Sequence, residues 1–197
     1  MTRFFRILLL GLSLIATLGA VFYLYQFNQK QLSEKLPVIA QVPDFTLTDE
    51  QNHPFMAQTL RGKVWVVDFI FTSCQGQCPA LSATFKELQE RYSDASRVQF
   101  LSISVDPEHD TPAALAEYAK RFNALDGRWH FLTGTEPVIR DLMIKGFKIG
   151  SDKDPNLHST FFVLVDQRGQ IRGYYDGFDN QAMGRLRRDL KILLKQS

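Results

Sequence analysis

Two cysteines separated by three residues are the side chains in this sequence best suited to chemistry. Cys74 and Cys78 are the only cysteines among 197 residues. A disulfide that closes so short a loop removes little chain entropy, so stabilising the fold is a poor explanation for the pair. If the segment is helical, side chains four positions apart have Cβ atoms about 5–6 Å apart. Two thiolates at that distance can bind one soft metal ion or form a disulfide, and buried inert cysteines are the weaker alternative.

The residues around the cysteines predict a strand before them and a helix after them. Residues 64–71 form a nearly continuous apolar run rich in branched and aromatic side chains, which is typical of a central strand covered on both faces. Pro79 favours the first turn of a helix. The unpaired N–H groups and the dipole at that helix N-terminus should stabilise a thiolate and lower the pKa of Cys78. We expect Gly76 to let the loop turn, so that both sulfurs face one point.

A third ligand would complete a metal site, and the sequence offers four histidines. Soft thiolates suit Cu(I), and an added imidazole also suits Cu(II). His53 and His109 lie in polar turns, and His130 begins a predicted strand. His158 follows a polar loop and precedes another predicted strand, where we expect it near the cysteine loop. From its position alone, His158 is explained equally well as a surface histidine.

The rest of the chain alternates between predicted strands and helices. Strands are predicted at residues 44–48, 64–71, 98–105, 130–133, 161–165 and 171–175, and helices at residues 79–92, 111–122, 135–146 and 179–193. This order predicts an α/β fold, a thioredoxin-like mixed sheet with flanking helices, with parallel central pairs and a closing hairpin. Sites in such sheets form beyond the carboxyl ends of the strands, where the cysteines lie. Asp106 lies at the same end, either beside the site or only as a turn residue before Pro107.

The N-terminus predicts a membrane anchor. Arg3 and Arg6 precede residues 7–29, which carry no charge and are mostly apolar. That run is long enough for a transmembrane helix, and the two arginines favour a cytoplasmic N-terminus. We expect an anchor at residues 1–29, a linker at 30–41 and a copper or redox domain at 42–197. A signal peptide cleaved after Ala20 is the alternative.

Both interpretations of the N-terminus export the domain. The expected location is the inner membrane of a bacterium, crossed once, with the domain facing the periplasm, where disulfides can persist. Beyond residue 30 the chain has 20 basic and 21 acidic side chains, a net charge of about −1. That balance argues against nucleic-acid binding.

Several motifs resemble those of the Sco/SenC family of copper-binding proteins, over essentially residues 40–195. They are Pro43-Asp44-Phe45, Phe71-Thr72-Ser73-Cys74 with Cys78-Pro79, Ser104-Val105-Asp106-Pro107 with Asp110-Thr111-Pro112, and His158-Ser159-Thr160 with Val163-Leu164-Val165-Asp166 and Gly169. The resemblance implies that Cys74, Cys78 and His158 are copper ligands. It also implies delivery of copper to the dinuclear copper centre of cytochrome c oxidase, or reduction of that centre's cysteines. The partner would be the copper-bearing subunit of the oxidase or another copper protein.

One departure from the family concerns the residues between the cysteines. The family usually has a proline and an acidic residue there, whereas this chain has Gln75-Gly76-Gln77. The loop is therefore neutral and more flexible. This difference leaves the ligands in place but bears on copper affinity, redox potential and the choice of partner.

Three functions remain open at this point. A copper metallochaperone needs reduced cysteines, because a disulfide supplies no thiolate ligands. A membrane-anchored thiol–disulfide oxidoreductase is the only enzyme among the three. In it, Cys74 would attack a disulfide of the partner, and Cys78 would resolve the mixed disulfide that forms. Such enzymes usually separate their cysteines by two residues, and a peroxidase would need a proline before Thr72. An interaction module would use the basic side chains of the last helix, although a solvated helix face explains them better. Those side chains are Arg185, Arg187, Arg188, Lys191 and Lys195.

Overall fold

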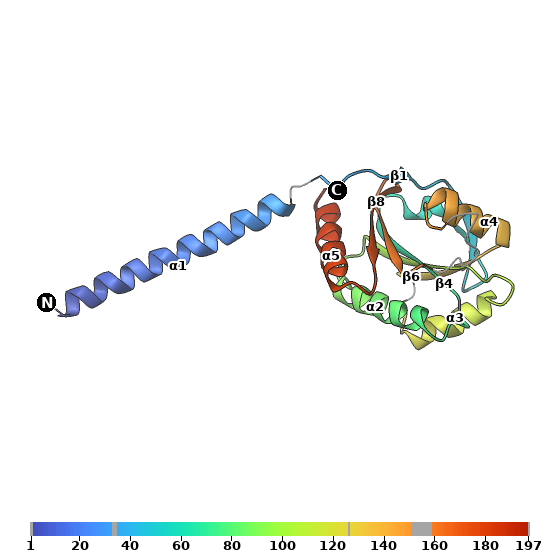
Figure 1. Ribbon diagram of the computed structural model, residues 1–197, viewed down its shortest axis with the longest axis horizontal. Helices are drawn as coiled ribbons and strands as arrows, with labels where there is room; N and C mark the ends of the chain where they lie inside the picture. The colour runs from blue at the N-terminus through green and yellow to red at the C-terminus, as the bar shows by residue number, and fades with distance from the viewer. Residues whose placement is uncertain (1, 33–34, 126, 151–158, 197) are drawn as a thin grey trace. The chain divides into compact units, whose positions relative to one another are not determined.

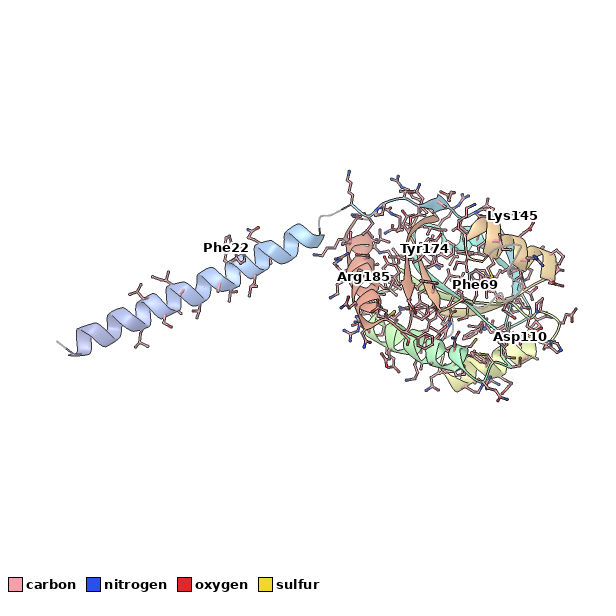
Figure 2. The ribbon with its side chains drawn as sticks, in the orientation of Figure 1. Phe22, Phe69, Asp110, Lys145, Tyr174 and Arg185 are labelled. Atoms are coloured by element: carbon pink, nitrogen blue, oxygen red, sulfur yellow. The ribbon has the colours of Figure 1, made fainter. Side chains whose placement is uncertain are left out.

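The computed structural model describes residues 2–32, 35–125, 127–150 and 159–196. The chain divides into two compact units, Met1–Lys35 and Leu36–Ser197. The first unit is one helix, α1 (Thr2–Leu32), which includes the predicted apolar run. The apolar side chains described on this helix, within residues 10–26, are exposed, at 70% for Leu10 and 63% for Phe22. Figure 2 labels Phe22 on the helix. Within the described part of the chain, no helix combines the length and the hydropathy needed to cross a membrane.

The second unit is an eight-stranded mixed sheet with helices on both faces (Figure 1). The strands are β1 (Ala40–Gln41), β2 (Thr46–Asp49), β3 (Pro54–Met56), β4 (Val64–Ile70), β5 (Val98–Ser104), β6 (Trp129–Thr133), β7 (Phe161–Val165) and β8 (Gln170–Asp176). The helices are η1 (Ala57–Leu60), α2 (Gln77–Arg91), α3 (Pro112–Arg121), α4 (Glu136–Asp141), η2 (Leu142–Gly146) and α5 (Asn180–Lys195).

The strand order is β1-β8-β7-β4-β5-β6-β2-β3. The central strands β4, β5 and β6 are parallel, and β7 and β8 form the antiparallel hairpin beside β4. The predicted mixed sheet with flanking helices is therefore confirmed. The edge strands β1 and β3 were not predicted, because two or three residues are too few to show an alternating pattern. The predicted helix 135–146 is an α-helical turn that continues as a π-helix and ends at Gly146.

The sheet separates two apolar cores, and β4 contributes alternate residues to each. Val66 and Ile70 pack in the core beneath α2, α3 and α5. Val67 and Phe69 pack in the core beneath α4 and η2, on the opposite face. All seven residues of β4 are buried, as its apolar composition predicted. Each large apolar side chain removed from water contributes about 1.5–3 kcal/mol, so β4 is a rigid base for the loop that follows it.

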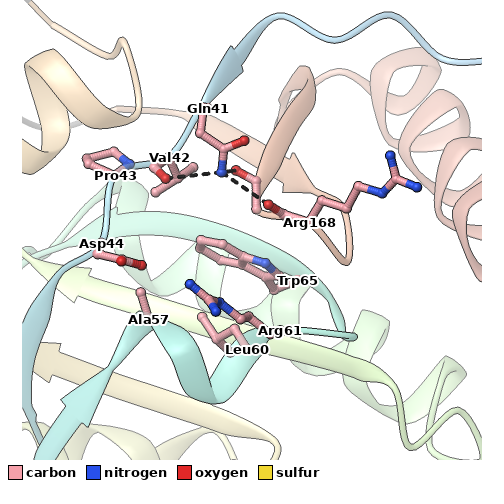
Figure 3. Close-up of a pocket in the computed structure, with 10 residues that line it drawn as sticks. Gln41, Val42, Pro43, Asp44, Ala57, Leu60, Arg61, Trp65 and Arg168 are labelled. Atoms are coloured by element: carbon pink, nitrogen blue, oxygen red, sulfur yellow. Dashed lines mark hydrogen bonds between the residues drawn. The ribbon is translucent and has the colours of Figure 1, made fainter.

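A small pocket beside the start of β4 is the cavity shown in Figure 3. Gln41 closes one side, where its Nε2 donates to the carbonyl oxygens of Arg168 and Gly169, both at 3.1 Å. Trp65, the second residue of β4, forms part of the wall. The pocket thus lies at the opposite end of β4 from the cysteine loop. Its lining contains neither thiol nor imidazole, so it contributes nothing to a metal site.

Candidate functional site

The two cysteines lie at the junction between the buried strand β4 and helix α2. The chain leaves β4 at Ile70, and the N–H of Cys74 donates to the carbonyl oxygen of Phe71 at 3.2 Å. Helix α2 begins at Gln77, so Cys78 occupies its first turn, as the sequence predicted. The N–H of Cys78 donates to the Sγ of Cys74 at 3.4 Å. Both cysteines are free thiols, and the turn brings them together at the carboxyl edge of the sheet.

The two thiols have opposite environments. Cys74 is partly exposed, whereas the residue Cys78 is only 2% exposed and belongs to the core beneath α2. Burial raises the pKa of Cys78 to about 12, and the nearby Cys74 and Asp68 add to that rise. Burial would also raise the pKa of Cys74, but hydrogen bonds from Cys78 and from the N–H groups of Gly76 and Gln77 outweigh it and lower the pKa.

This arrangement corrects the sequence prediction, which assigned the lowered pKa to Cys78. The N–H groups at the start of α2 point toward the sulfur of Cys74, which precedes the helix in sequence. The free N–H groups of a helix N-terminus point out of the helix, toward the preceding part of the chain. Cys78 is within the first turn and its side chain enters the core. Cys74 therefore receives the stabilisation of the helix terminus, whereas burial dominates at Cys78 and outweighs the hydrogen bond from the Phe71 N–H.

Gly76 is the N-cap of α2, with φ −116° and ψ −96°. A Cβ added at this position would meet no heavy atom within 4 Å. Close packing therefore does not require glycine here. The two sulfurs meet because β4 ends and α2 begins within a few residues.

A buried carboxyl group beneath α2 was not predicted. Asp68 lies in the middle of β4, is fully buried, and neither carboxylate oxygen has a well-oriented hydrogen-bond partner among the described residues. Burial raises its pKa to about 7, against a smaller opposing effect of the Ser102 hydroxyl. The signal in the sequence is a single acidic residue inside an apolar run, which a strand covered on both faces does not normally tolerate.

Asp106 does not contact either cysteine through any hydrogen bond or ion pair found in the described structure. Its carboxylate Oδ1 lies 2.8 Å from the Nδ1 of His109, and that contact raises the pKa of the exposed histidine. Its carbonyl oxygen accepts from the N–H groups of His109 and Asp110. These contacts favour the interpretation of Asp106 as a turn residue.

His158, the predicted third ligand, lies outside the described residues. Strand β7, the next described element, runs antiparallel to β4 with Val163 paired to Val67. The start of β7 is thus at the edge where β4 ends and the cysteine loop begins. The N–H of Gly177 donates to the carbonyl oxygen of Thr160 at 2.8 Å, which fixes the approach to β7 at that edge.

Neither His130 nor His53 lies in the elements that carry the thiols. His130 is in β6, with its ring 4.8 Å from that of Phe55 and its Nε2 3.2 Å from Gln99 Oε1. His53 is in the turn between β2 and β3. Across the described ranges, no three side chains of the histidine, cysteine, aspartate and glutamate types form a cluster able to hold a metal ion. The described site therefore supplies two soft ligands, and these fit a copper ion.

The fold and the cysteine pair define a class of protein. A mixed sheet with helices on both faces, and with two cysteines at the junction of a central strand and the helix after it, is thioredoxin-like. The chain belongs to the SCO1/SenC family, whose model matches residues 34–193.

Relatives of known sequence and structure agree with this assignment. The SCO1 protein homolog of Bacillus subtilis is 31% identical over 182 residues, covering 89% of this chain and 93% of its own. The structure of BsSco, a member of the Sco family of cytochrome c oxidase assembly proteins with a disulfide switch, matches with a TM-score of 0.71 and 29% identity over 83% of this chain and all of its own. ScoI of Bradyrhizobium japonicum with copper bound matches with a TM-score of 0.61 and 26% identity over 76% and 99%.

Proposed function

We propose that this protein is a copper metallochaperone that holds one copper ion through Cys74, Cys78 and His158. It would pass the ion by ligand exchange to the copper-bearing subunit of cytochrome c oxidase or to another copper protein. The observation that carries the proposal is the pair of free thiols brought together at the junction of β4 and α2. Thiolates are the ligands that Cu(I) prefers, and an imidazole extends the site to Cu(II).

Three findings support the choice of copper as the cargo. The chain belongs to the SCO1/SenC family. A relative of the same fold, ScoI of Bradyrhizobium japonicum, has been solved with copper bound, and BsSco belongs to a family that assembles cytochrome c oxidase. The antiparallel register of β7 with β4 favours His158 as the third ligand, because the residues before β7 approach the edge of the sheet that carries the thiols.

The different environments of the two thiols suit a carrier that both binds and releases its ion. Cys74 is partly exposed and its lowered pKa favours the thiolate, so it can be the first ligand to meet an incoming ion or an accepting partner. Cys78 is buried, and a copper ion must displace its proton before the sulfur can bind. Loading of the second thiolate therefore releases a proton and depends on pH.

A thiol–disulfide oxidoreductase is the second candidate, and the same two side chains would carry it. Cys74 has the lowered pKa and the exposure expected of an attacking thiol, and Cys78 has the burial expected of a resolving thiol. BsSco, the relative with a disulfide switch, adds to the case for a redox step. The two functions require different oxidation states of the pair, since a disulfide offers no thiolate to copper.

We also propose that α1 anchors the chain in the inner membrane, with the second unit facing the periplasm. Residues 7–29 carry no charge, and Arg3 and Arg6 precede them. The described apolar side chains of this helix are exposed, from 58% at Leu12 to 70% at Ile15. A lipid environment would remove them from water.

Replacement of His158 separates the two candidate functions. The full chain in mild detergent is reduced, loaded with copper without oxygen, and compared with its His158→Ala variant. We expect the variant to lose copper affinity by at least about tenfold, the lower end for loss of a group at a metal site, while it still reduces a test disulfide at the wild-type rate. Equal loss of both activities would contradict the division of roles, and unchanged copper affinity would remove His158 from the ligand set.

A further inference from the structure

The carboxylate of Asp110 is buried at the edge of the sheet that carries the cysteines. Asp110 is 0% exposed, although it belongs to the loop between β5 and α3 (Figure 2). A buried carboxylate is costly unless donors surround it, so its partners show what it stabilises. The donors are two hydroxyl groups and one backbone N–H group. They come from the cysteine loop and from strand β5, and none comes from helix α3.

Two of the three donors come from the cysteine loop. The hydroxyl of Thr72 donates to Oδ1 at 2.6 Å, and its backbone N–H lies 3.2 and 3.1 Å from the two carboxylate oxygens. Thr72 is two residues before Cys74. It is also the second residue after β4 ends, so its N–H can no longer be satisfied by the regular pairing of the strand. Asp110 replaces that missing pairing.

The third donor comes from the neighbouring strand. The hydroxyl of Ser104, the last residue of β5, donates to Oδ2 of Asp110 at 2.5 Å, and it accepts from the N–H of Asp106 at 3.1 Å. On its other side, Asp110 precedes Thr111, which caps α3 through a bond from the N–H of Ala114. One side chain thus ties the ends of β4 and β5 to the start of α3.

We propose that Asp110 is a positioning residue that holds the cysteine loop so that the thiol of Cys74 faces that of Cys78. Within the loop, the N–H of Cys74 donates to the carbonyl oxygen of Phe71, and the sulfur of Cys74 accepts from backbone N–H groups at the start of α2; neither contact involves Thr72. Charge-assisted hydrogen bonds are stronger than neutral ones, so the Asp110 contacts are the main fixation at the start of the loop. The inference rests on the proposed use of Cys74 and Cys78, but its test requires no copper.

The physical consequence is a higher effective concentration of one thiol toward the other. Two thiols that the fold already holds close together react with each other more readily than two thiols on a loose loop. The entropy cost of ordering them has been met by folding and is not part of the reaction. Release of the loop should therefore make the Cys74–Cys78 disulfide less stable. The partly exposed Asp106 offers a matched control, because it carries the same charge in the same loop but bonds only to His109 through its carboxylate.

The test is the equilibrium between the Cys74–Cys78 disulfide and dithiothreitol, measured by thiol trapping on the full chain in mild detergent. We expect Asp110→Asn to lower the equilibrium constant for forming the protein disulfide about tenfold, which raises the reduction potential by about 30 mV for a two-electron couple. We expect Asp106→Asn to leave the constant within about twofold of wild type, a change of less than 10 mV.

Variants at Thr72 keep the test decisive if Asp110→Asn folds poorly. Thr72→Val removes the hydroxyl donor and should move the constant in the same direction, whereas Thr72→Ser keeps the donor and should restore it. No shift in Asp110→Asn and Thr72→Val, a shift of the opposite sign, or an equal shift in Asp106→Asn would overturn the proposal. Failure of the wild-type chain to bind copper would instead count against the proposed function and would leave this equilibrium unaffected.

Discussion

The two cysteines of this protein occupy one turn of chain but belong to different physical environments. Cys74 is partly exposed, receives hydrogen bonds from the start of α2, and follows a loop fixed by the fully hydrogen-bonded carboxylate of Asp110. Cys78 is buried in the core, and the nearby carboxyl group of Asp68 contributes to the rise of its pKa. Asp68 itself has no well-oriented hydrogen-bond partner among the described residues. The thiolate form is therefore favoured at Cys74 and disfavoured at Cys78.

This difference shows that burial alone does not decide what a polar group does. Asp68 and Asp110 are both 0% exposed. Asp110 accepts from three donors and can serve as a fixed anchor for backbone and side chains. Asp68 lacks such donors, so burial favours its neutral form and raises its pKa to about 7. The hydrogen bonds that a buried carboxyl group makes, rather than its depth, distinguish the two roles.

The largest expected effect is a difference in reactivity between the two thiols. At about pH 8, Cys74 should be alkylated by iodoacetamide at least about a hundredfold faster than Cys78, because the thiolate is the reactive form and only Cys74 is favoured as a thiolate and accessible. Peptide mass mapping after short exposures measures both rates. In concentrated guanidinium chloride the two rates should converge. Equal rates in the folded protein would contradict the asymmetry.

A smaller effect concerns stability and pH, through Asp68. Its pKa is raised from 3.8 to about 7, so the folded state binds more protons than the unfolded state between these values. The contribution of Asp68 to the free energy of unfolding should therefore be largest below about pH 4. It should fall as pH rises through 7, by at most about 4 kcal/mol.

The Asp68→Asn variant tests that assignment, because it removes the titrating group while keeping its shape. Denaturant unfolding at several pH values should show a flatter dependence between about pH 4 and 8 in the variant than in wild type. Asp94→Asn changes an exposed aspartate by the same charge and should retain the wild-type slope. A wild-type slope in Asp68→Asn would show that Asp68 is ionised in the fold and that an unrecognised partner stabilises it.

The order of elements could be predicted from the sequence because long, uniform signals encode it. The apolar runs of β4 and β5 indicate buried parallel strands, and the hairpin of β7 and β8 follows from two short strands around a turn. The edge strands β1 and β3 could not be predicted, since two or three residues carry no pattern of their own, and the partner of β1 lies about 130 residues further along the chain.

The position of the site could also be predicted, but its electrostatics could not. The spacing of the cysteines and the proline after them place both thiols at the start of a helix. Which sulfur the helix N–H groups face is a matter of three-dimensional geometry, and the sequence prediction assigned it to Cys78 instead of Cys74. The role of Asp110 depends on Thr72, 38 residues earlier, and a contact of that range leaves no local signal.

The copper stoichiometry of the reduced full chain distinguishes a metallochaperone from an oxidoreductase. Bound metal and free thiols are determined together after anaerobic loading, for wild type and for Cys74→Ala, Cys78→Ala and His158→Ala. We expect one copper per wild-type chain, with both thiols consumed on binding and stoichiometric copper lost in each variant. A wild-type chain that binds no stoichiometric copper but rapidly reduces a test disulfide would contradict the metallochaperone and favour the oxidoreductase.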